Sequence, residues 1–218
     1  MTGYTQSPKV LKGGLVLLDP GTAAIQRIIS LQYNPESLTR TLQMQAVGGE
    51  GPRAEPLRLK GPAVESLRLE AEIDAADQLE LPEQHQTVVK YGVQPQLAAL
   101  EALVHPASER LLANLALANA GTLEIAPIEA PLTLFVWSRS RIVPVRVTEF
   151  SITEEAFDPS LNPIRAKVSL GLRVLSIDDL GFDHKGGQLF MGYLQTKERL
   201  ATQSPGITLG ALGLGGIP

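Results

Sequence analysis

Hydrophobic and polar residues alternate strictly along two segments of the chain, 67–74 and 164–174. A period of two places alternate side chains on opposite faces of a β-strand, so one face is buried and the other is polar. The pattern therefore predicts two long, half-buried strands. Their inward residues form the predicted core: Leu67, Leu69, Ile73, Val168, Leu170 and Leu172.

Three further apolar segments near the N-terminus, 10–18, 25–33 and 38–44, have strand composition. The turn sequences Asp19-Pro20-Gly21-Thr22 and Asn34-Pro35-Glu36-Ser37 separate them. Proline presets φ for a turn, glycine supplies positive φ, and an Asn side chain can form an Asx turn. We expect the three strands to form a meander.

Strand composition returns at 132–137 and 141–157, and a proline-containing turn, 158–163, then leads into the long strand at 164–174. Val143, Val145 and Val147 share one phase of the alternation, whereas Phe150 and Ile152 share the other. Since a shift of one residue moves every side chain to the opposite face, we expect a β-bulge near Thr148-Glu149.

Helical spacing appears at 95–120, where Pro106 interrupts the pattern. We expect Pro106 in the first turn of a second helix, which Gly121 ends. The proline- and glycine-rich segment 48–62 is interpreted as a long loop or arm. After residue 177 we expect a polar connector (178–187), a short amphipathic helix at about 189–200 and a glycine-rich tail (206–218).

These elements indicate a mainly β fold: an antiparallel β-barrel or sandwich with a flanking α-helical segment, hence α+β. We divide the chain into a β domain, residues 1–177, and a region of connector, short helix and tail, residues 178–218. Such a fold suits both structural proteins and binding proteins, so its side chains must decide the function.

Composition narrows the range of functions. The 218 residues are 44% hydrophobic and 19% charged, with a formal net charge of -4. An acidic balance argues against nucleic-acid binding, which usually needs a basic surface. The N-terminus lacks the apolar region of a signal peptide, and no apolar run is long enough to insert directly into a membrane. Without cysteine, thiolate catalysis and Cys-type zinc sites are excluded.

Candidate catalytic groups are few. His85, His105 and His184 have no metal-ligand spacing, so we expect ordinary histidines. Asp74 with Asp77, and the acidic residues at 154–158, are interpreted as solvated strand ends rather than acid–base pairs. We therefore predict no catalytic residue, no metal or cofactor site, and no enzymatic activity.

Four segments resemble one protein family: LQYNPESLTRTLQ (31–43), LRLEAEIDAAD (67–77), VQPQLAALEALVHP (93–106), and the long stretch LFVWSRSRIVPVRVTEFSITEEAFDPSLNPIRAKVSLGLRVLS (134–176). Together they resemble the tube-like N-terminal domain of the contractile injection system family that includes LysM-type baseplate adaptors of extracellular phage-tail-like particles. The resemblance covers about residues 10–177. The 42 residues after Ser176 show no LysM-like pattern.

The resemblance implies a tail-tube-like β-barrel that forms a homo-hexameric ring between the inner tube and the spike and baseplate. Implied partners are inner tube subunits, the spike protein and baseplate or wedge components. Assembly is then expected in the bacterial cytoplasm, with release as part of the particle. Two alternatives from other classes are a ligand- or glycan-binding β-barrel and a tail-associated peptidoglycan-cleaving enzyme.

Candidate interaction residues fall into three groups. The first is a basic stripe on the polar side of the last strand, interpreted either as a solvated face or as a lumen wall or ring contact that meets the acidic stripe Glu70–Asp74 of a neighbour. The second lies in the arm at 48–62, and the third on the C-terminal helix, which packs either on its own barrel or on a partner. The residues are Arg165, Lys167 and Arg173; Arg53, Arg58 and Lys60; and Phe190 and Tyr193.

Overall fold

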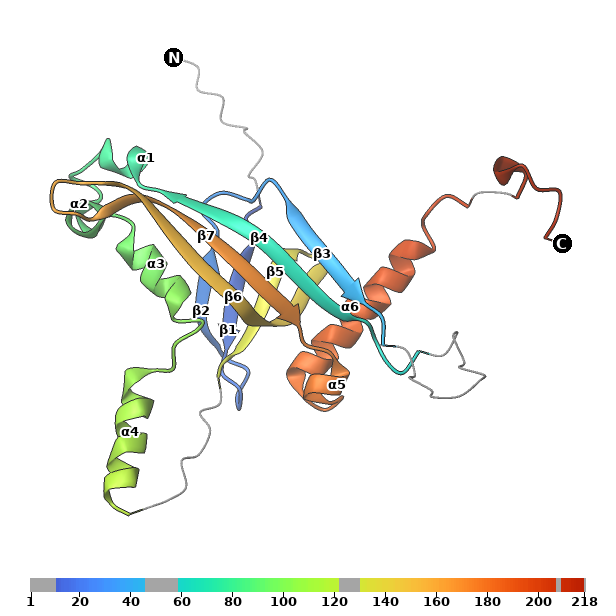
Figure 1. Ribbon diagram of the computed structural model, residues 1–218, viewed down its shortest axis with the longest axis horizontal. Coiled ribbons are helices and arrows are strands. Elements are labelled where there is room, and N and C mark those ends of the chain that lie inside the picture. Colours follow the sequence, from blue (N-terminus) through green and yellow to red (C-terminus); the bar gives the residue numbers. More distant parts are fainter. Residues whose placement is uncertain (1–10, 46–58, 122–129, 207–208, 218) are drawn as a thin grey trace.

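The computed structural model describes residues 11–45, 59–121, 130–206 and 209–217 (Figure 1). Seven strands and a set of mostly short helices make up these residues, which gives the mainly β, α+β fold that the sequence predicts. The strands are β1 (Gly14–Leu18), β2 (Ile25–Ser30), β3 (Leu38–Gln43), β4 (Val64–Asp74), β5 (Leu132–Ser138), β6 (Arg141–Phe157) and β7 (Pro163–Val174). The helices are α1 (Ala76–Leu79), α2 (Gln86–Tyr91), α3 (Gln94–Glu101), α4 (Ser108–Asn119), α5 (Ile177–Leu180), α6 (Lys185–Ala201) and the 3-10 helix η1 (Leu209–Leu212).

All seven strands belong to one antiparallel sheet in the order β2-β1-β5-β6-β7-β4-β3. The long β6–β7 hairpin lies in the middle of this strand order. Strand β4 pairs with β7 along nine positions, from Ser66 to Asp74. Both alternating segments are therefore the long strands that their period predicts. Strands β2 and β3 form the two edges.

The hairpin of β1 and β2 is confirmed, but the prediction that β3 continues it as a three-strand meander is wrong. Strand β3 pairs with β4, not with β2, so consecutive strands lie at opposite edges of the sheet. Asn34 explains the different path. Instead of closing a local turn, its side chain accepts a hydrogen bond from Gly13 N (2.9 Å) and donates one to the carbonyl of Leu11 (2.7 Å). These bonds tie the chain to the start of β1 and direct it across to β4.

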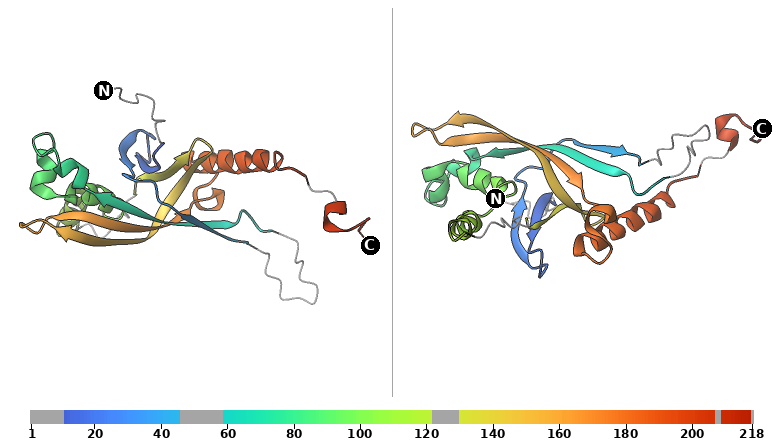
Figure 2. Two further views of the ribbon diagram at one scale, coloured as in Figure 1. Left: turned by 90° about the horizontal axis from the view of Figure 1, so that it is seen from above. Right: turned by 60° about the horizontal axis from the view of Figure 1, so that its bottom comes forward.

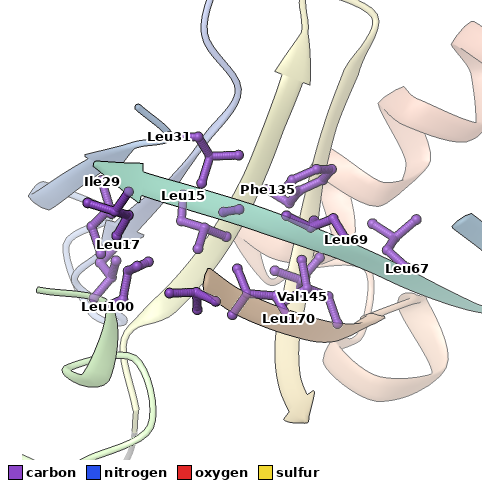
Figure 3. Close-up of a cluster of buried hydrophobic side chains, with 14 of the residues drawn as sticks. Leu15, Leu17, Ile29, Leu31, Leu67, Leu69, Leu100, Phe135, Val145 and Leu170 are labelled. Atoms are coloured by element: carbon purple, nitrogen blue, oxygen red, sulfur yellow. The ribbon is translucent and has the colours of Figure 1, made fainter. Parts of the chain in front are cut away.

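The sheet curls so that β1 and β2, at one edge of the strand order, pack across one core against β4, near the other edge. Figure 3 shows Leu15, Leu17 and Ile29, from β1 and β2, in the same buried cluster as Leu67 and Leu69 of β4. All six predicted core residues are buried, with exposed fractions of at most 6%.

Gln32 bridges the two ends of this folded sheet. Its Nε2 donates to the carbonyl of Asp74 (2.7 Å), and its Oε1 accepts from the amide of Asp74 (3.0 Å). One side-chain amide thus makes the pair of bonds that a neighbouring strand would make with β4. The side chain compensates locally for the missing strand pairing at the end of β4.

The predicted bulge is present, because the β6–β7 register shifts between Val147 and Glu149. Opposite it lies Gly171 of β7, which is buried. A Cβ on Gly171 would come within 2.8 Å of Glu149 Cβ, so the bulge needs a residue without a side chain there. The bulge lets Phe150 and Ile152 pack against the same core as Val143 and Val145.

The helical segment at 95–120 consists of two helices that differ in burial. Leu97 and Leu100 of α3 belong to the core, whereas α4 has no buried residue. Pro106 was expected in the first turn of the second helix, but it precedes the N-cap, Ala107. Gly121 has the positive φ of +83° expected of a residue that follows a helix.

The segment expected to be a polar connector, 178–187, is mostly helical. Ser176 caps α5 through a capping box with Asp179, and His184 Nδ1 accepts a hydrogen bond from Gly186 N (3.0 Å) at the start of α6. Two of the three glycines in this segment, Gly186 and Gly187, lie in the first turn of α6, where a Cβ on Gly187 would collide with the carbonyl of Gly181. Gly181 ends α5 with a positive φ of +76°. Helix α6 packs along β6 and then extends beyond the sheet (Figure 2).

Candidate assembly surfaces

The polar face of β4, β7 and β6 carries the predicted basic stripe, and its charges are paired within the chain. Arg165 lies opposite Asp74 in the β4–β7 ladder, and its Nε donates to Asp74 Oδ2 at 2.7 Å. Lys167 Nζ lies 3.4 Å from Glu155 Oε1 on β6. Arg165 thus already pairs with an acidic residue of its own chain, and its contact with a neighbouring subunit stays a prediction. Because β4 and β7 are adjacent strands, the two stripes lie side by side in one molecule.

Asp74 is held in its ionised form by this arrangement. The backbone amide of Ala76 donates to its Oδ1 (2.7 Å), and the hydrogen bond and charge of Arg165 act in the same direction. Together they outweigh the effect of burial and hold the pKa of Asp74 below its ordinary value. The carboxylate raises the pKa of Arg165 in return.

Arg173, the third residue of the basic stripe, lies at the other end of β7. Its Nη2 lies 2.8 Å from Asp179 Oδ1 of α5, and about a third of its side chain is exposed. Asp179 also accepts from the backbone amide of Ser176, so this ion pair fastens the start of α5 to the sheet. Arg173 is thus a structural contact within the chain.

A buried acid of β4 that the sequence analysis missed contacts side chains of β3 and α6. Glu65 is 3% exposed, and its carboxylate contacts Arg40 Nε (2.9 Å) and Lys197 Nζ (2.8 Å). Tyr193 donates its hydroxyl to Glu65 Oε1 at 3.0 Å, and Lys197 also lies over the Tyr193 ring. One carboxylate therefore joins an edge strand, an inner strand and a helix.

Burial acts to raise the pKa of Glu65, but the donors around it act more strongly. The hydrogen bond and charge of Lys197, the charge of Arg40 and the Tyr193 hydroxyl hold the pKa of Glu65 below its ordinary value. The sequence carried a signal for this site. Glu65 has the same phase as Leu67 and Leu69, so a charged residue occupies an inward position of a strictly alternating strand.

Phe190 and Tyr193, which were candidate interaction residues, are 5% and 6% exposed and belong to the core cluster. Helix α6 therefore packs on its own sheet, which is one of the two alternatives that the sequence left open. The arm candidates Arg53 and Arg58 lie outside the described residues. Lys60 is exposed, and its backbone amide donates to the carbonyl of Gln45 (2.8 Å).

Both edges of the sheet present apolar side chains to solvent. Ile25 and Ile28 of β2 are 64% and 66% exposed, and Leu42 of β3 is 53% exposed. Within the described chain, β2 and β3 each pair with one strand only. An unpaired edge with exposed apolar residues can accept a strand from another chain. These edges are candidate assembly surfaces.

The turn end of the β6–β7 hairpin is a further exposed apolar site, with Phe157 and Leu161 50% and 76% exposed. Asp158 holds this turn by accepting from the amides of Ser160 and Asn162 at 2.7 and 2.8 Å. The side-chain and backbone hydrogen bonds from Asn162 come first among the causes that lower the pKa of Asp158. These hydrogen bonds fix the backbone conformation of the turn that joins the two long strands.

Neither a metal-binding cluster nor a membrane-spanning helix occurs among the described residues. They contain no group of three His, Asp or Glu side chains placed to hold a metal ion. No helix among them is long and apolar enough to cross a membrane. The acidic residues at 74 and 158 that could suggest acid–base chemistry form the structural bonds given above.

Comparison with known proteins gives little. No family model matches the chain, and no curated protein matches it. Among solved structures, one alignment is with a chain described as "Tail of empty GTA particle computed with helical refinement, C6 symmetry". It covers 78% of this chain and 94% of the other, at 15% sequence identity and a TM-score of 0.29. A TM-score of that size does not establish a common fold.

Proposed function

We propose that this chain is a structural subunit of a phage-tail-like contractile injection system. In this proposal it forms a homo-hexameric ring at the junction between the inner tube and the spike and baseplate. Its partners are inner tube subunits above, and the spike protein and baseplate or wedge components below. Assembly takes place in the bacterial cytoplasm, and the protein leaves the cell with the particle.

The observation that carries the proposal is that both edge strands of the sheet, β2 and β3, are unpaired on their outer sides within the described residues. Four neighbouring strands, β6-β7-β4-β3, end at an unpaired edge, and β2 leaves a second edge unpaired within the described residues. Edges of this kind are a liability in a free monomer, and a ring of identical subunits with head-to-tail contacts covers both at once. The number six comes from the family resemblance of residues 10–177. The segments that carry the resemblance correspond to β3, β4, α3 and β5–β7.

A structural role also suits the chemistry of the polar face. Its acidic and basic side chains, including Asp74, Arg165 and Lys167, bond to one another and stiffen the long strands. Catalytic acids and bases need a cleft and a pKa matched to proton transfer. The pKa of Asp74 and of Asp158 is instead lowered by structural hydrogen bonds. We accordingly propose that the subunit is not an enzyme.

The experiment is to purify particles from cells that produce an epitope-tagged copy of the chain. Cryo-electron microscopy with a bound antibody fragment is expected to label one level of the particle, between tube and spike, in six positions. Deleting the gene is expected to abolish particles in which tube and baseplate are joined. Intact particles from the deletion strain, or a ring with another number of subunits, would contradict the proposal.

A further inference from the structure

Strand β3 is weakly anchored within the sheet. None of its six residues is buried, whereas five of the eleven residues of β4 are. Leu38 is the residue of β3 that packs against the core cluster, and β4 is the strand with which β3 pairs. Local opening is easiest where few apolar contacts must break, so β3 is expected to open more readily than the strands inside the sheet.

Arg40 provides the other side-chain anchor of β3. It lies on the inward face of the sheet with Glu65 of β4, and its Nε donates to Glu65 Oε1 at 2.9 Å. The Arg40 side chain is 29% exposed, but that of Glu65 is 3% exposed. Two opposite charges attract each other more strongly where water is excluded. The strength of this anchor therefore depends on what keeps water from Glu65.

Helix α6 helps to keep water from Glu65. Tyr193, which is 6% exposed, donates its hydroxyl at 3.0 Å to Glu65 Oε1, the oxygen that Arg40 also contacts. Lys197 Nζ lies 2.8 Å from the other oxygen, Glu65 Oε2. Figure 1 shows α6 passing beside the end of β3. One buried carboxylate is thus a shared anchor for an edge strand and a helix that are far apart in the sequence.

Each of these two elements therefore strengthens the hold on the other. When α6 lifts, water reaches Glu65 and weakens its attraction for Arg40. When β3 leaves, Arg40 leaves with it, and Glu65 is then buried under α6 with Lys197 as its one cationic contact among the described residues. Burying a charge with fewer partners costs more free energy. Coupling between two equilibria is reciprocal, so both effects have the same size.

We propose that Glu65 couples α6 to β3, so that α6 acts as a latch on this edge strand. While α6 is docked, β3 stays on β4. A contact that lifts α6 increases the local opening of β3 and uncovers the edge of β4 beneath it. The end of α6 beyond Lys197 is exposed and extends past the sheet, as Figure 2 shows, so it is within reach of another molecule. The proposal concerns the folded chain and does not rest on the injection-system function.

Hydrogen–deuterium exchange of the full chain tests this coupling. Lys197→Met removes one cation from Glu65 and keeps an unbranched apolar side chain in its place. Exchange of the backbone amides of β3 is expected to rise at least about fivefold, together with exchange of α6, while the other edge strand, β2, stays unchanged. Arg199→Met, at an exposed position two residues further along α6, is the matched control and is expected to leave β3 unchanged.

The reciprocal variant is Arg40→Met, which is expected to increase exchange of α6 by a similar factor. Arg27→Met, at an exposed position of β2, is its control and is expected to leave α6 unchanged. If Lys197→Met does not fold, Tyr193→Phe removes only the hydroxyl that Glu65 accepts and carries the same comparison. An increase confined to α6 in Lys197→Met would show that the two elements open independently, and would overturn the proposal. Equal increases in β2 and β3 would overturn it as well, because they indicate a general loss of stability.

Discussion

Among single residues, Glu65 is where three elements meet, and it sets a pH dependence of stability. Its folded-state pKa lies below the ordinary value of 4.5, so its contribution is fully present above about that pH. The contribution is lost as pH falls through the lower folded pKa, when the carboxylate takes up a proton. We expect Glu65→Gln to lower the free energy of unfolding at pH 7 by about 3 kcal/mol, because Lys197 and Arg40 lose their counter-charge.

Urea denaturation at pH 7 and at about pH 3 measures this effect, and the difference between wild type and Glu65→Gln is expected to shrink at the lower pH. Glu70→Gln is the matched control on the same strand. Glu70 is exposed, so a change within about 0.5 kcal/mol is expected. An unchanged stability in Glu65→Gln would mean that the buried ion pairs contribute nothing net.

Two glycines provide a prediction with opposite signs for one substitution. Gly171→Ala places a methyl group 2.8 Å from Glu149 Cβ at the bulge, and we expect a loss of about 1–3 kcal/mol from overpacking. Gly192→Ala lies on the exposed side of α6 with nothing within 4 Å, so a gain of about 0.5–1 kcal/mol is expected. Thermal unfolding of both variants measures the pair. A stabilised Gly171→Ala would show that the bulge does not need glycine.

At the scale of elements, α6 is part of the folded monomer. Phe190 and Tyr193 bury one side of the helix, and Lys197 bonds to Glu65 one turn further on. Amide exchange of the isolated chain is therefore expected to show strong protection around these residues. Phe190→Ala is expected to cost about 3–5 kcal/mol and to remove that protection. Leu200→Ala, at a half-exposed position of the same helix, is the control and should leave both nearly unchanged.

Element by element, the sequence predicted what depends on local pattern. Alternation identified β4 and β7 with the correct inward faces, and the phase change between Val147 and Phe150 located the bulge. It could not predict which strands pair. The path from β2 to β3 depends on Asn34 bonding to residues more than 20 positions away, and the end of β4 on Gln32, 42 positions away. Neither bond has a periodic signature.

The candidate surfaces were only partly predictable for a related reason. Helical spacing predicted an apolar stripe on α4 and another on α6, but the pattern alone cannot tell which stripe the chain itself covers. The structure buries Phe190 and leaves Leu112 exposed. Likewise, alternation put Arg165 and Glu72 on polar faces, but their ion pairing depends on β4 lying beside β7.

At the scale of the whole molecule, the open β3 edge gives a test of assembly that spares the fold. Leu42 is about half exposed on this edge, so Leu42→Lys is expected to change the free energy of unfolding by less than about 0.5 kcal/mol. A lysine on an edge strand opposes pairing with another chain, because pairing would bury its charge. We therefore expect Leu42→Lys to fold normally and to be absent from purified particles. Immunoblots of the particles, with the signal of the variant normalised to that of the sheath protein, measure this.

The matched control for this variant is Val89→Lys, which adds the same charge at a similarly exposed apolar position on α2, away from both sheet edges. It is expected to enter particles at the wild-type level. If Leu42→Lys enters equally well, the β3 edge is not a subunit contact. Loss of both variants from particles would instead point to a general effect of added positive charge. Only selective loss of Leu42→Lys fits a ring in which the edge strand of one subunit meets the next.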